Sequence, residues 1–381
     1  MPVEGAIQIH LAVADGLFSQ VDIRNRRLLS VTASLAGRPA HEVPGLVSRL
    51  FSICRTAQGL AALDAFEQTQ GIIPTTAQRA ARRFLINGET VLEHAGRACL
   101  DWTQSLGEPP ALAALKSLRG ALANLPHFVF PGADGMRFGD GDPSPDVDRL
   151  RECLLSVETG LNQIIFGTCP PLDPEKWDVW LASGETVAAR LAARLRADGL
   201  ADFGAVTMPV LPEFDRDWLE AKLTADHDGS FVACPDWNGT QFLTGPLARQ
   251  RYHPVVAAIV DASGQGLLAQ LAARVVELGC LLREMWEYAR GLCDDHLACH
   301  QATGGMAIVE AARGRLVHRV EQSEGIVTRY QILAPTEWNF HPRGPLVQGL
   351  LGRPAGDNPK ARVTLLVAAL DPCVSCQIEG P

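Results

Sequence analysis

Apolar residues recur at three- and four-residue spacing along much of this chain, and this pattern limits its possible folds more than any other feature. Such spacing puts apolar side chains on one face of an α-helix, which can bury that face against a neighbour. Proline and glycine separate these stretches, most clearly in the loop-rich segment 131–146. The pattern predicts helices over residues 46–61, 75–106, 147–165, 175–197, 266–291 and 357–370.

Two shorter segments show the alternation of β-strands instead. The first 24 residues contain two alternating runs joined by Asp15-Gly16, and a second pair between residues 316 and 334 turns at Glu324-Gly325. No linker, repeat or low-complexity tract divides the sequence. We therefore expect a mainly α fold (α+β with small N-terminal and C-terminal-half hairpins), built as a single domain over residues 1–381.

Composition excludes several classes of protein. Hydrophobic residues make up 47% and charged residues 20%, which is typical of a globular protein. The net charge of −9 argues against binding to nucleic acid. No apolar run is long enough to cross a membrane, and the first residues do not resemble an export signal. We expect a cytoplasmic protein with neither nucleic acid nor membrane as a partner.

The sequence contains ten cysteines, and in a reducing compartment they are not expected to form disulfides. Most should be small buried side chains. Glycine-rich phosphate loops and the HExxH and GxSxG motifs are missing from the sequence. One group has spacing that zinc could use, although the end of a helix would explain it equally well; it consists of Cys293, His296, Cys299 and His300.

A second group of cysteines lies in the segment DPCVSC, at residues 371–376. Asp371-Pro372 predicts the start of a helix, and the N-terminus of a helix favours thiolates. Two thiolates three residues apart can bind one soft metal ion. A tail that carries two idle thiols is the alternative.

Several segments resemble nickel–iron hydrogenase large subunits, and they occur in the same order as in that family. Near the start are GRP at residues 37–39 and SRLFSIC at residues 48–54. The later ones are GPLAR, EAARG, APTEWN and DPCVSC, at residues 245–249, 310–314, 334–339 and 371–376. This order implies the fold of a hydrogenase large subunit.

The resemblance implies a metal site of which only part is kept. In these enzymes two CxxC pairs hold a nickel ion and an iron that carries cyanide and carbon monoxide. The first cysteine of each pair binds nickel, and the second bridges the two metals. Here the bridging positions match Cys54 and Cys376, and one nickel position matches Cys373. The other nickel position is Phe51, whose ring would fill the space of a fourth thiolate, so nickel is not expected.

Other differences from the family sequence occur at residues that have other functions in the enzymes. The family's histidine after the first pair corresponds to Gln58, and its final histidine corresponds to Glu379. The family's proton-relay glutamate is replaced in the segment LSVT, whose Thr32 cannot act as a relay at its normal pKa. We also expect no C-terminal peptide for a maturation protease to remove. The resemblance therefore implies a protein that is not an enzyme.

Residues that surround the iron ligands in the family are kept. Arg313 would hydrogen-bond one cyanide, and the hydroxyl of Thr336 would donate to the other. Leu316 would help to enclose carbon monoxide, and Asp371 would hold Arg313 in position. Each of these residues has an ordinary structural explanation by itself. Their occurrence together with Cys54 favours a retained iron site.

This combination of losses and retained residues resembles hydrogenase accessory proteins of the HupK/HoxV type. That resemblance implies a maturation protein that transiently carries the iron–dicyanide–carbonyl unit. Its partners would be the hydrogenase large-subunit precursor and the Hyp maturation proteins, including a small chaperone of the HypC/HupF type. Two alternatives stay open: an interaction protein with a vestigial or zinc-binding pocket, and a hydrogenase or hydrogen sensor with an altered nickel site.

Overall fold

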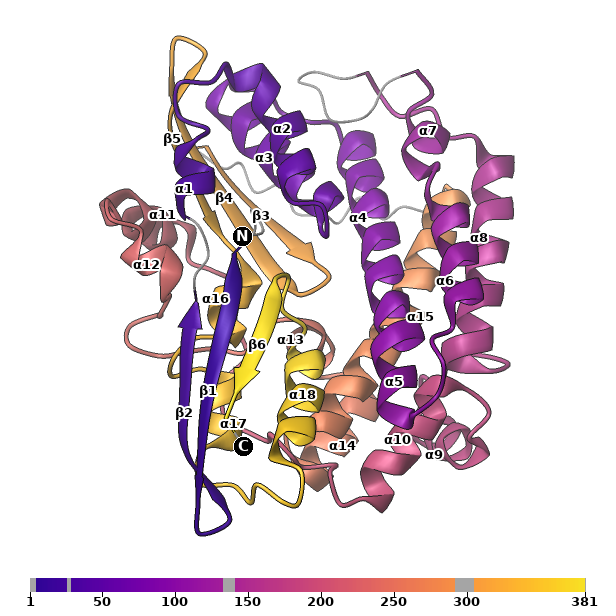
Figure 1. Ribbon diagram of the computed structural model, residues 1–381. Helices are drawn as coiled ribbons and strands as arrows, with labels where there is room; N and C mark the ends of the chain where they lie inside the picture. The colour runs from indigo at the N-terminus through magenta and orange to yellow at the C-terminus, as the bar shows by residue number, and fades with distance from the viewer. Residues whose placement is uncertain (1–4, 26–28, 133–140, 292–304, 381) are drawn as a thin grey trace.

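The computed structural model describes residues 5–25, 29–132, 141–291 and 305–380, and most of these residues are helical (Figure 1). The group with the spacing of a zinc site or a helix end, Cys293, His296, Cys299 and His300, lies outside the described residues. The α-helices are α1 (Leu29–Ala33), α2 (Val43–Leu50), α3 (Arg55–Thr69), α4 (Thr76–Arg97), α5 (Thr103–Leu106), α6 (Leu112–Leu122), α7 (Leu125–Val129), α8 (Val147–Leu161), α9 (Pro174–Ser183), α10 (Val187–Ala197), α11 (Arg216–Ala225), α12 (Ser230–Ala233), α13 (Pro246–Gln250), α14 (Pro254–Ser263), α15 (Leu267–Ala289), α16 (Pro335–Asn339), α17 (Pro345–Leu350) and α18 (Pro359–Leu370). Short 3₁₀ or π segments are Ala40–Glu42, Ala98–Trp102 and Asn162–Phe166.

Helix α15 is central to the fold, because it contacts α4, α8, α10, α13, α14 and α18. Its first half is almost entirely buried. The helix begins directly after Gly266, where a Cβ would lie 2.7 Å from the carbonyl oxygen of Ala201. Helix α4 begins with a capping box, in which Thr75 and Gln78 satisfy each other's backbone N–H groups. The two long helices α4 and α15 contact each other and form the rigid frame of the fold (Figure 1).

The N-terminal hairpin forms a sheet with the tail of the chain. Strand β1 (Ala6–Ala14) pairs antiparallel with β2 (Leu17–Asn25), and β6 (Ser375–Glu379) pairs in parallel with the other side of β1. Ile7 stands opposite Cys376. Figure 1 shows the indigo hairpin beside the yellow tail. The tail with its two cysteines is thus part of a sheet.

A second sheet has the strand order β3 (Met306–Ala311), β4 (Gly314–Ser323) and β5 (Ile326–Leu333), and both pairings are antiparallel. Helix α3 lies against β3 and β4. The contact includes the ring of Phe66 on α3, whose centroid is 6.0 Å from that of Tyr330 on β5. The sheet therefore connects the helix that follows Cys54 to the turn that carries Arg313.

The helix-dominated α+β fold with its two hairpins is confirmed. Both hairpin turns have positive φ at their central residues, as Asp-Gly and Glu-Gly turns of this kind require. The single helix predicted over residues 46–61 is wrong. Helix α2 ends at Leu50 and α3 begins at Arg55, so the break contains both Phe51 and Cys54.

The helix predicted to start at Asp371-Pro372 is also wrong. Asp371 ends α18 with a φ of 53°, and the tail continues as β6. Asp-Pro is compatible with the end of one helix as well as with the start of another. Here the tail forms strand β6 and not a helix, because its backbone N–H and C=O groups find hydrogen-bond partners along the edge of β1.

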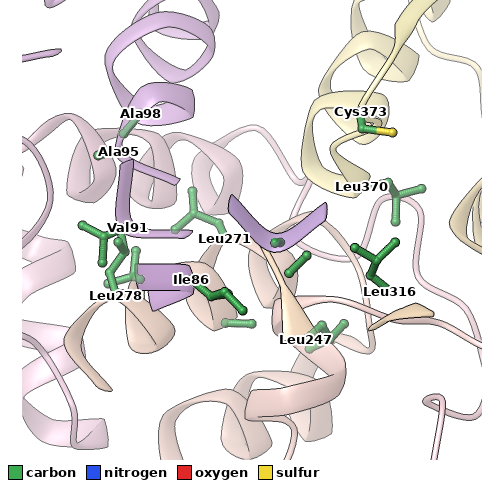
Figure 2. Packing of buried hydrophobic residues seen from close by; sticks show 14 of the residues in the cluster. Ile86, Val91, Ala95, Ala98, Leu247, Leu271, Leu278, Leu316, Leu370 and Cys373 are labelled. Carbon is green, nitrogen blue, oxygen red and sulfur yellow. The ribbon is translucent and has the colours of Figure 1, made fainter. Parts of the chain in front are cut away.

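Apolar side chains form a main core and a smaller one. Figure 2 shows part of the main core, including Val91 of α4, Leu271 of α15 and Leu316 of β4. The smaller core gathers side chains from residues 211–232 around Trp338. Within the described residues, no helix is both long and apolar enough to span a membrane.

We predict that Ile9→Ala destabilises the protein by about 2–5 kcal/mol, because Ile9 is fully buried in the strand that joins β2 to β6. Ile326→Ala is the matched control, since Ile326 is 41% exposed at the start of β5 and its truncation should cost less than about 1 kcal/mol. Chemical denaturation measures both values. Equal losses would show that the N-terminal sheet is not a principal part of the core.

Candidate metal centre

Cys54 lies at the start of α3, where the chain leaves the break after α2. Its own side chain does not cap the helix. Glu89 of α4 does so instead, because its carboxylate accepts hydrogen bonds from the backbone N–H groups of Thr56 (2.7 Å) and Ala57 (3.0 Å). Glu89 thus ties the start of α3, which follows Cys54, to helix α4.

Cys373 lies between α18 and β6, and its sulfur is 3.2 Å from the hydroxyl oxygen of Thr336. The same oxygen accepts a 3.4 Å hydrogen bond from the backbone N–H of Cys373. Both residues are buried. Thr336 thus lies at the predicted site, in contact with a cysteine.

Of the three predicted cysteines, Cys54 and Cys376 each interact electrostatically with Cys373. Burial and the neighbouring Cys373 and Glu89 raise the pKa of Cys54 to about 12. Burial and Cys373 likewise raise the pKa of Cys376 to about 12. Both thiols are consequently protonated at neutral pH, and a metal that binds them must displace their protons. Close approach of Cys54 to Cys376 stays a prediction, because it is with Cys373 that each of them interacts.

The set of side chains that could bind a metal at this site is small. In the parts of the chain that the structure describes, no group of three or more His, Cys, Asp or Glu side chains is arranged to hold a metal ion. A closed four-ligand zinc site of the kind found in structural domains is therefore not formed by these residues.

Asp371 joins three elements to the tail. Its carboxylate lies 2.6 Å from Nη2 of Arg97 on α4, 3.3 Å from Nε of Arg313 and 3.8 Å from Nη2 of Arg274 on α15. Burial alone would raise the pKa of Asp371, but the charges of these arginines lower it below its ordinary value. Asp371 is only 1% exposed, and the neighbouring arginines keep it ionised, so it forms an ion pair with Arg313 in the interior.

Of the candidate residues, Arg313 gives the strongest indication that this site binds a ligand. It is 3% exposed, and its Nη2 donates a 2.9 Å hydrogen bond to Glu93. Nη1 is buried and has no hydrogen-bond partner among the described residues. Burial lowers the pKa of Arg313, but Asp371, Glu93 and the two nearby cysteines Cys373 and Cys54 raise it above its ordinary value. A buried cationic donor beside two sulfurs fits a small anionic acceptor such as cyanide.

The turn that carries Arg313 is formed by segments that are distant in the sequence. Gly314 has a φ of 131°, and a Cβ there would lie 2.5 Å from the hydroxyl oxygen of Thr244. Asn339 exchanges two 3.1 Å hydrogen bonds with the backbone of Thr244. Arg249 donates to the carbonyl oxygens of residues 311 and 312. The segments GPLAR, EAARG and APTEWN therefore meet at one place.

Leu316 is 1% exposed on β4, where it pairs with Val309. Figure 2 draws Leu316, Leu370 and Cys373 in the same part of the main core. An apolar wall at this position suits an uncharged ligand. A role next to carbon monoxide stays a prediction for Leu316.

The positions that depart from the enzymes have ordinary structural partners. Phe51 is 8% exposed and ends α2. Glu379 forms a 3.1 Å ion pair with His10 of β1. Gln58 hydrogen-bonds to the buried ring of His318. Thr32 lies in α1 and lines a cavity of about 440 Å³ together with Tyr330.

Sequence reasoning missed the polar residues that organise the site. Glu89, Glu93 and Arg97 follow one another at four-residue spacing on α4 and face α3, Arg313 and Asp371 respectively. Their spacing was the available signal, because it places all three on one helix face. Charged residues at such spacing are usually found on a solvated surface, so the pattern does not by itself indicate a site.

The fold places this protein in the class of hydrogenase large-subunit-like proteins. Residues 205–379 match the family model for nickel-dependent hydrogenases. The structure resembles that of the Ni-Fe-Se hydrogenase of Desulfovibrio vulgaris Hildenborough, with a TM-score of 0.65, 16% identity and 95% of each chain covered. It also resembles that of Desulfomicrobium baculatum, with a TM-score of 0.67, 17% identity and the same coverage. These likenesses concern the fold.

Sequence relatives are more specific. The chain is 30% identical over 388 residues to the hydrogenase expression/formation protein HupK of Bradyrhizobium diazoefficiens, which covers 98% of this chain and 96% of the relative. It is 27% identical to the hydrogenase expression/formation protein HoxV of Cupriavidus necator, over 91% and 89% of the two chains. The chain belongs to the HupK/HoxV family of hydrogenase expression/formation proteins, as the resemblance indicated.

We predict that Asp371→Asn lowers the free energy of unfolding by about 3–5 kcal/mol, because buried arginines lose the charge that neutralises them. The matched control is Asp101→Asn. Asp101 pairs with Arg97 at 2.8 Å but is 30% exposed, so its loss should cost less than about 1 kcal/mol. Denaturant titration followed by circular dichroism gives both values. Similar values for the two variants would contradict a structural role for Asp371.

Proposed function

We propose that this protein is a non-catalytic maturation protein that carries the iron–dicyanide–carbonyl unit to the hydrogenase large-subunit precursor. The names of its relatives, hydrogenase expression/formation proteins, support a role in hydrogenase assembly. The iron unit is cargo in this proposal, and the protein acts on it by binding and release. We place this activity in the cytoplasm, where the Hyp maturation proteins would supply the unit.

One observation carries the proposal: the buried guanidinium of Arg313 lies beside Cys54 and Cys373, and its Nη1 has no hydrogen-bond partner in the described parts of the chain. Two thiolates can bind a soft low-spin iron, and a cationic N–H donor can hydrogen-bond a cyanide nitrogen. The hydroxyl of Thr336, next to Cys373, provides a second donor. Positive charge from Arg313 also offsets the negative charge of thiolates and cyanides in a buried site.

The same residues also favour release of the iron unit. Burial and Cys373 raise the pKa of Cys54 to about 12, so a proton competes with the metal for this sulfur, and this competition favours release. A bridging nickel would lock both sulfurs to the iron. With Phe51 at the fourth position we expect no nickel, so each iron–sulfur bond can exchange separately. These properties suit a carrier better than a catalyst.

The decisive experiment is infrared spectroscopy with iron analysis on protein purified from cells that contain the maturation proteins. Bands of bound cyanide and carbon monoxide, with iron near one equivalent per chain, are expected. Zinc without these bands would indicate an interaction protein with a vestigial pocket. Nickel together with hydrogen turnover would indicate a hydrogenase or hydrogen sensor. Pull-down of the large-subunit precursor and of a small HypC/HupF-type chaperone would test the proposed partners.

We predict that Cys54→Ala and Cys376→Ala each abolish the infrared bands, because each variant lacks one of the two iron-binding sulfurs. Cys373→Ala should keep a weaker signal, since its position corresponds to a nickel ligand. Cys153→Ala is the control, because Cys153 is a buried thiol outside the site. Equal loss in all three site variants would favour a three-cysteine site. Full retention in all three would contradict cargo binding at this pocket.

We predict that Phe51→Cys gains weak nickel affinity, because it restores a CxxC pair with Cys54 and opens space in a packed site. Removal of the ring should cost about 3 kcal/mol. Phe166→Cys is the control, a buried phenylalanine elsewhere that should lose similar stability without binding nickel. Equilibrium dialysis measures the affinity.

The Phe51→Cys variant should nevertheless fail to turn over hydrogen, because Thr32 replaces the proton relay and Glu379 replaces the final histidine. Hydrogen turnover by the variant would show that these losses matter less than expected. A folded variant that binds no nickel would mean that Phe51 does not face the pocket.

A further inference from the structure

Three consecutive carbonyl groups of the turn that carries Arg313 contact helix α13. Nη1 of Arg249 on α13 donates a 3.1 Å hydrogen bond to the carbonyl oxygen of Ala311, and Nη2 donates one of 3.2 Å to that of Ala312. The carbonyl oxygen of Arg313 would lie 3.0 Å from a Cβ at Gly245, directly before the helix. Gly245 has a φ of 111°, where a side chain would be strained. Both ends of α13 thus support this turn.

Every donor of the Arg249 guanidinium is occupied. A guanidinium has five N–H donors, of which Arg249 uses two on the carbonyl groups of the turn. A third, on Nη1, donates a 3.0 Å hydrogen bond to Glu310. The other two, on Nε and Nη2, donate to the two carboxylate oxygens of Glu277 on α15, at 2.5 Å and 2.9 Å. Arg249 is therefore placed to hold the backbone and not to bind a ligand.

Glu277 is in turn fixed by α4. Nε2 of the fully buried His94 lies 2.8 Å from the same carboxylate oxygen of Glu277 that accepts from Nη2 of Arg249. Burial would raise the pKa of Glu277, but the charge of Arg249 and hydrogen bonds from Arg249 and His94 lower it well below its ordinary range. The carboxylate is thus ionised, and His94 donates to it. Helices α4 and α15 therefore determine where the guanidinium of Arg249 lies.

The guanidinium of Arg313 is held at two of its three nitrogens. Nη2 donates a 2.9 Å hydrogen bond to Glu93, and Nε lies 3.3 Å from the carboxylate of Asp371. Nη1 has no hydrogen-bond partner among the described residues. A displaced turn would redirect Nη1 or break the contacts at the other two nitrogens. Because a binding group must be held to within about 0.5 Å, the support of this turn matters for binding.

We propose that Arg249 is a positioning residue that holds the backbone of residues 311–313 and thereby determines where Nη1 of Arg313 donates. The inference rests on the proposed function only where it concerns the iron unit, because Nη1 would then be the donor to one cyanide. Glu277 takes part by orienting Arg249. Lysine would not suffice at this position, because an ammonium group lacks the planar fork that holds a carboxylate and two carbonyl groups at once.

The first test needs no metal. Protein labelled with ¹⁵N-arginine is examined by NMR, with the Nε resonance of Arg313 assigned from an Arg313→Lys spectrum. We expect Arg249→Lys to shift this resonance in the folded protein, because the charge is kept while the turn loses its hydrogen bonds. An unchanged Arg313 resonance in folded Arg249→Lys would overturn the proposal. If that variant does not fold, Glu310→Gln serves instead, since Glu310 is 38% exposed, and it should shift the resonance by less.

Arg190→Lys is the matched control. Arg190 of α10 also donates to both carboxylate oxygens of one glutamate, Glu108, at 2.8 Å each, and to the carbonyl oxygens of residues 184 and 185 after α9. The same kinds of hydrogen bond are lost in this variant, but at another place in the fold. The Arg313 resonance should stay unchanged. A shift as large as that in Arg249→Lys would contradict a specific role for Arg249.

The second test asks whether Glu277 acts through Arg249. Glu277→Gln removes the charge that orients Arg249, so it should shift the Arg313 resonance in the same direction as Arg249→Lys. The double variant should show a shift no larger than that of Arg249→Lys alone, because both changes break one connection. A shift equal to the sum of the two single shifts would overturn the part assigned to Glu277.

The third test uses the iron-loaded protein. Arg249→Lys should shift the infrared cyanide bands, and a chelator should remove the iron several-fold faster, because the donor to one cyanide is displaced. Arg190→Lys should change neither. Unshifted bands with unchanged iron loss in folded Arg249→Lys would overturn the effect on the cargo. If the wild-type protein never shows these bands, the carrier role fails, while the NMR test still decides whether Arg249 positions Arg313.

Discussion

The ionised carboxylate of Asp371 is the interaction on which the site depends. It fixes the end of α18 and meets guanidinium groups from α4, α15 and the β3–β4 turn. A buried charge of this kind is tolerated only when its partners are in place, so the four elements are held in one arrangement. Cys373 follows two residues later, and its position relative to Arg313 is a direct consequence.

Helix α4 organises the pocket although it contributes none of the cysteines. Over two turns it caps α3 through Glu89, pairs with Arg313 through Glu93 and pairs with Asp371 through Arg97. The two cysteine-bearing segments are therefore aligned by a third element that belongs to the rigid frame with α15. These contacts hold the side chains of the site in place through the packing of the helices themselves.

Sequence patterns predicted the long helices α4, α8 and α15 and both hairpins, because these depend on local periodicity and turn residues. They did not predict the helices between residues 216 and 263. They did not predict the break at Phe51 and Cys54, where apolar spacing continues across two separate helices. Nor did they predict β6, which exists because a distant strand offers it partners. The candidate residues Arg313, Thr336 and Asp371 came from resemblance, and the structure places them together. The ion pairs of Arg97 and Arg274 with Asp371 were missed because charged residues at helical spacing usually lie on a solvated face, and the spacing does not identify a partner elsewhere in the sequence.

The parallel pairing of β1 with β6 also has a consequence for biosynthesis. A ribosome synthesises β1 long before β6, so Cys376 cannot take its place opposite Ile7 until the residues between the two strands have been synthesised. Closing so large a loop costs conformational entropy and slows folding. The N-terminal hairpin therefore keeps an unpaired edge on the ribosome until β6 emerges to cover it.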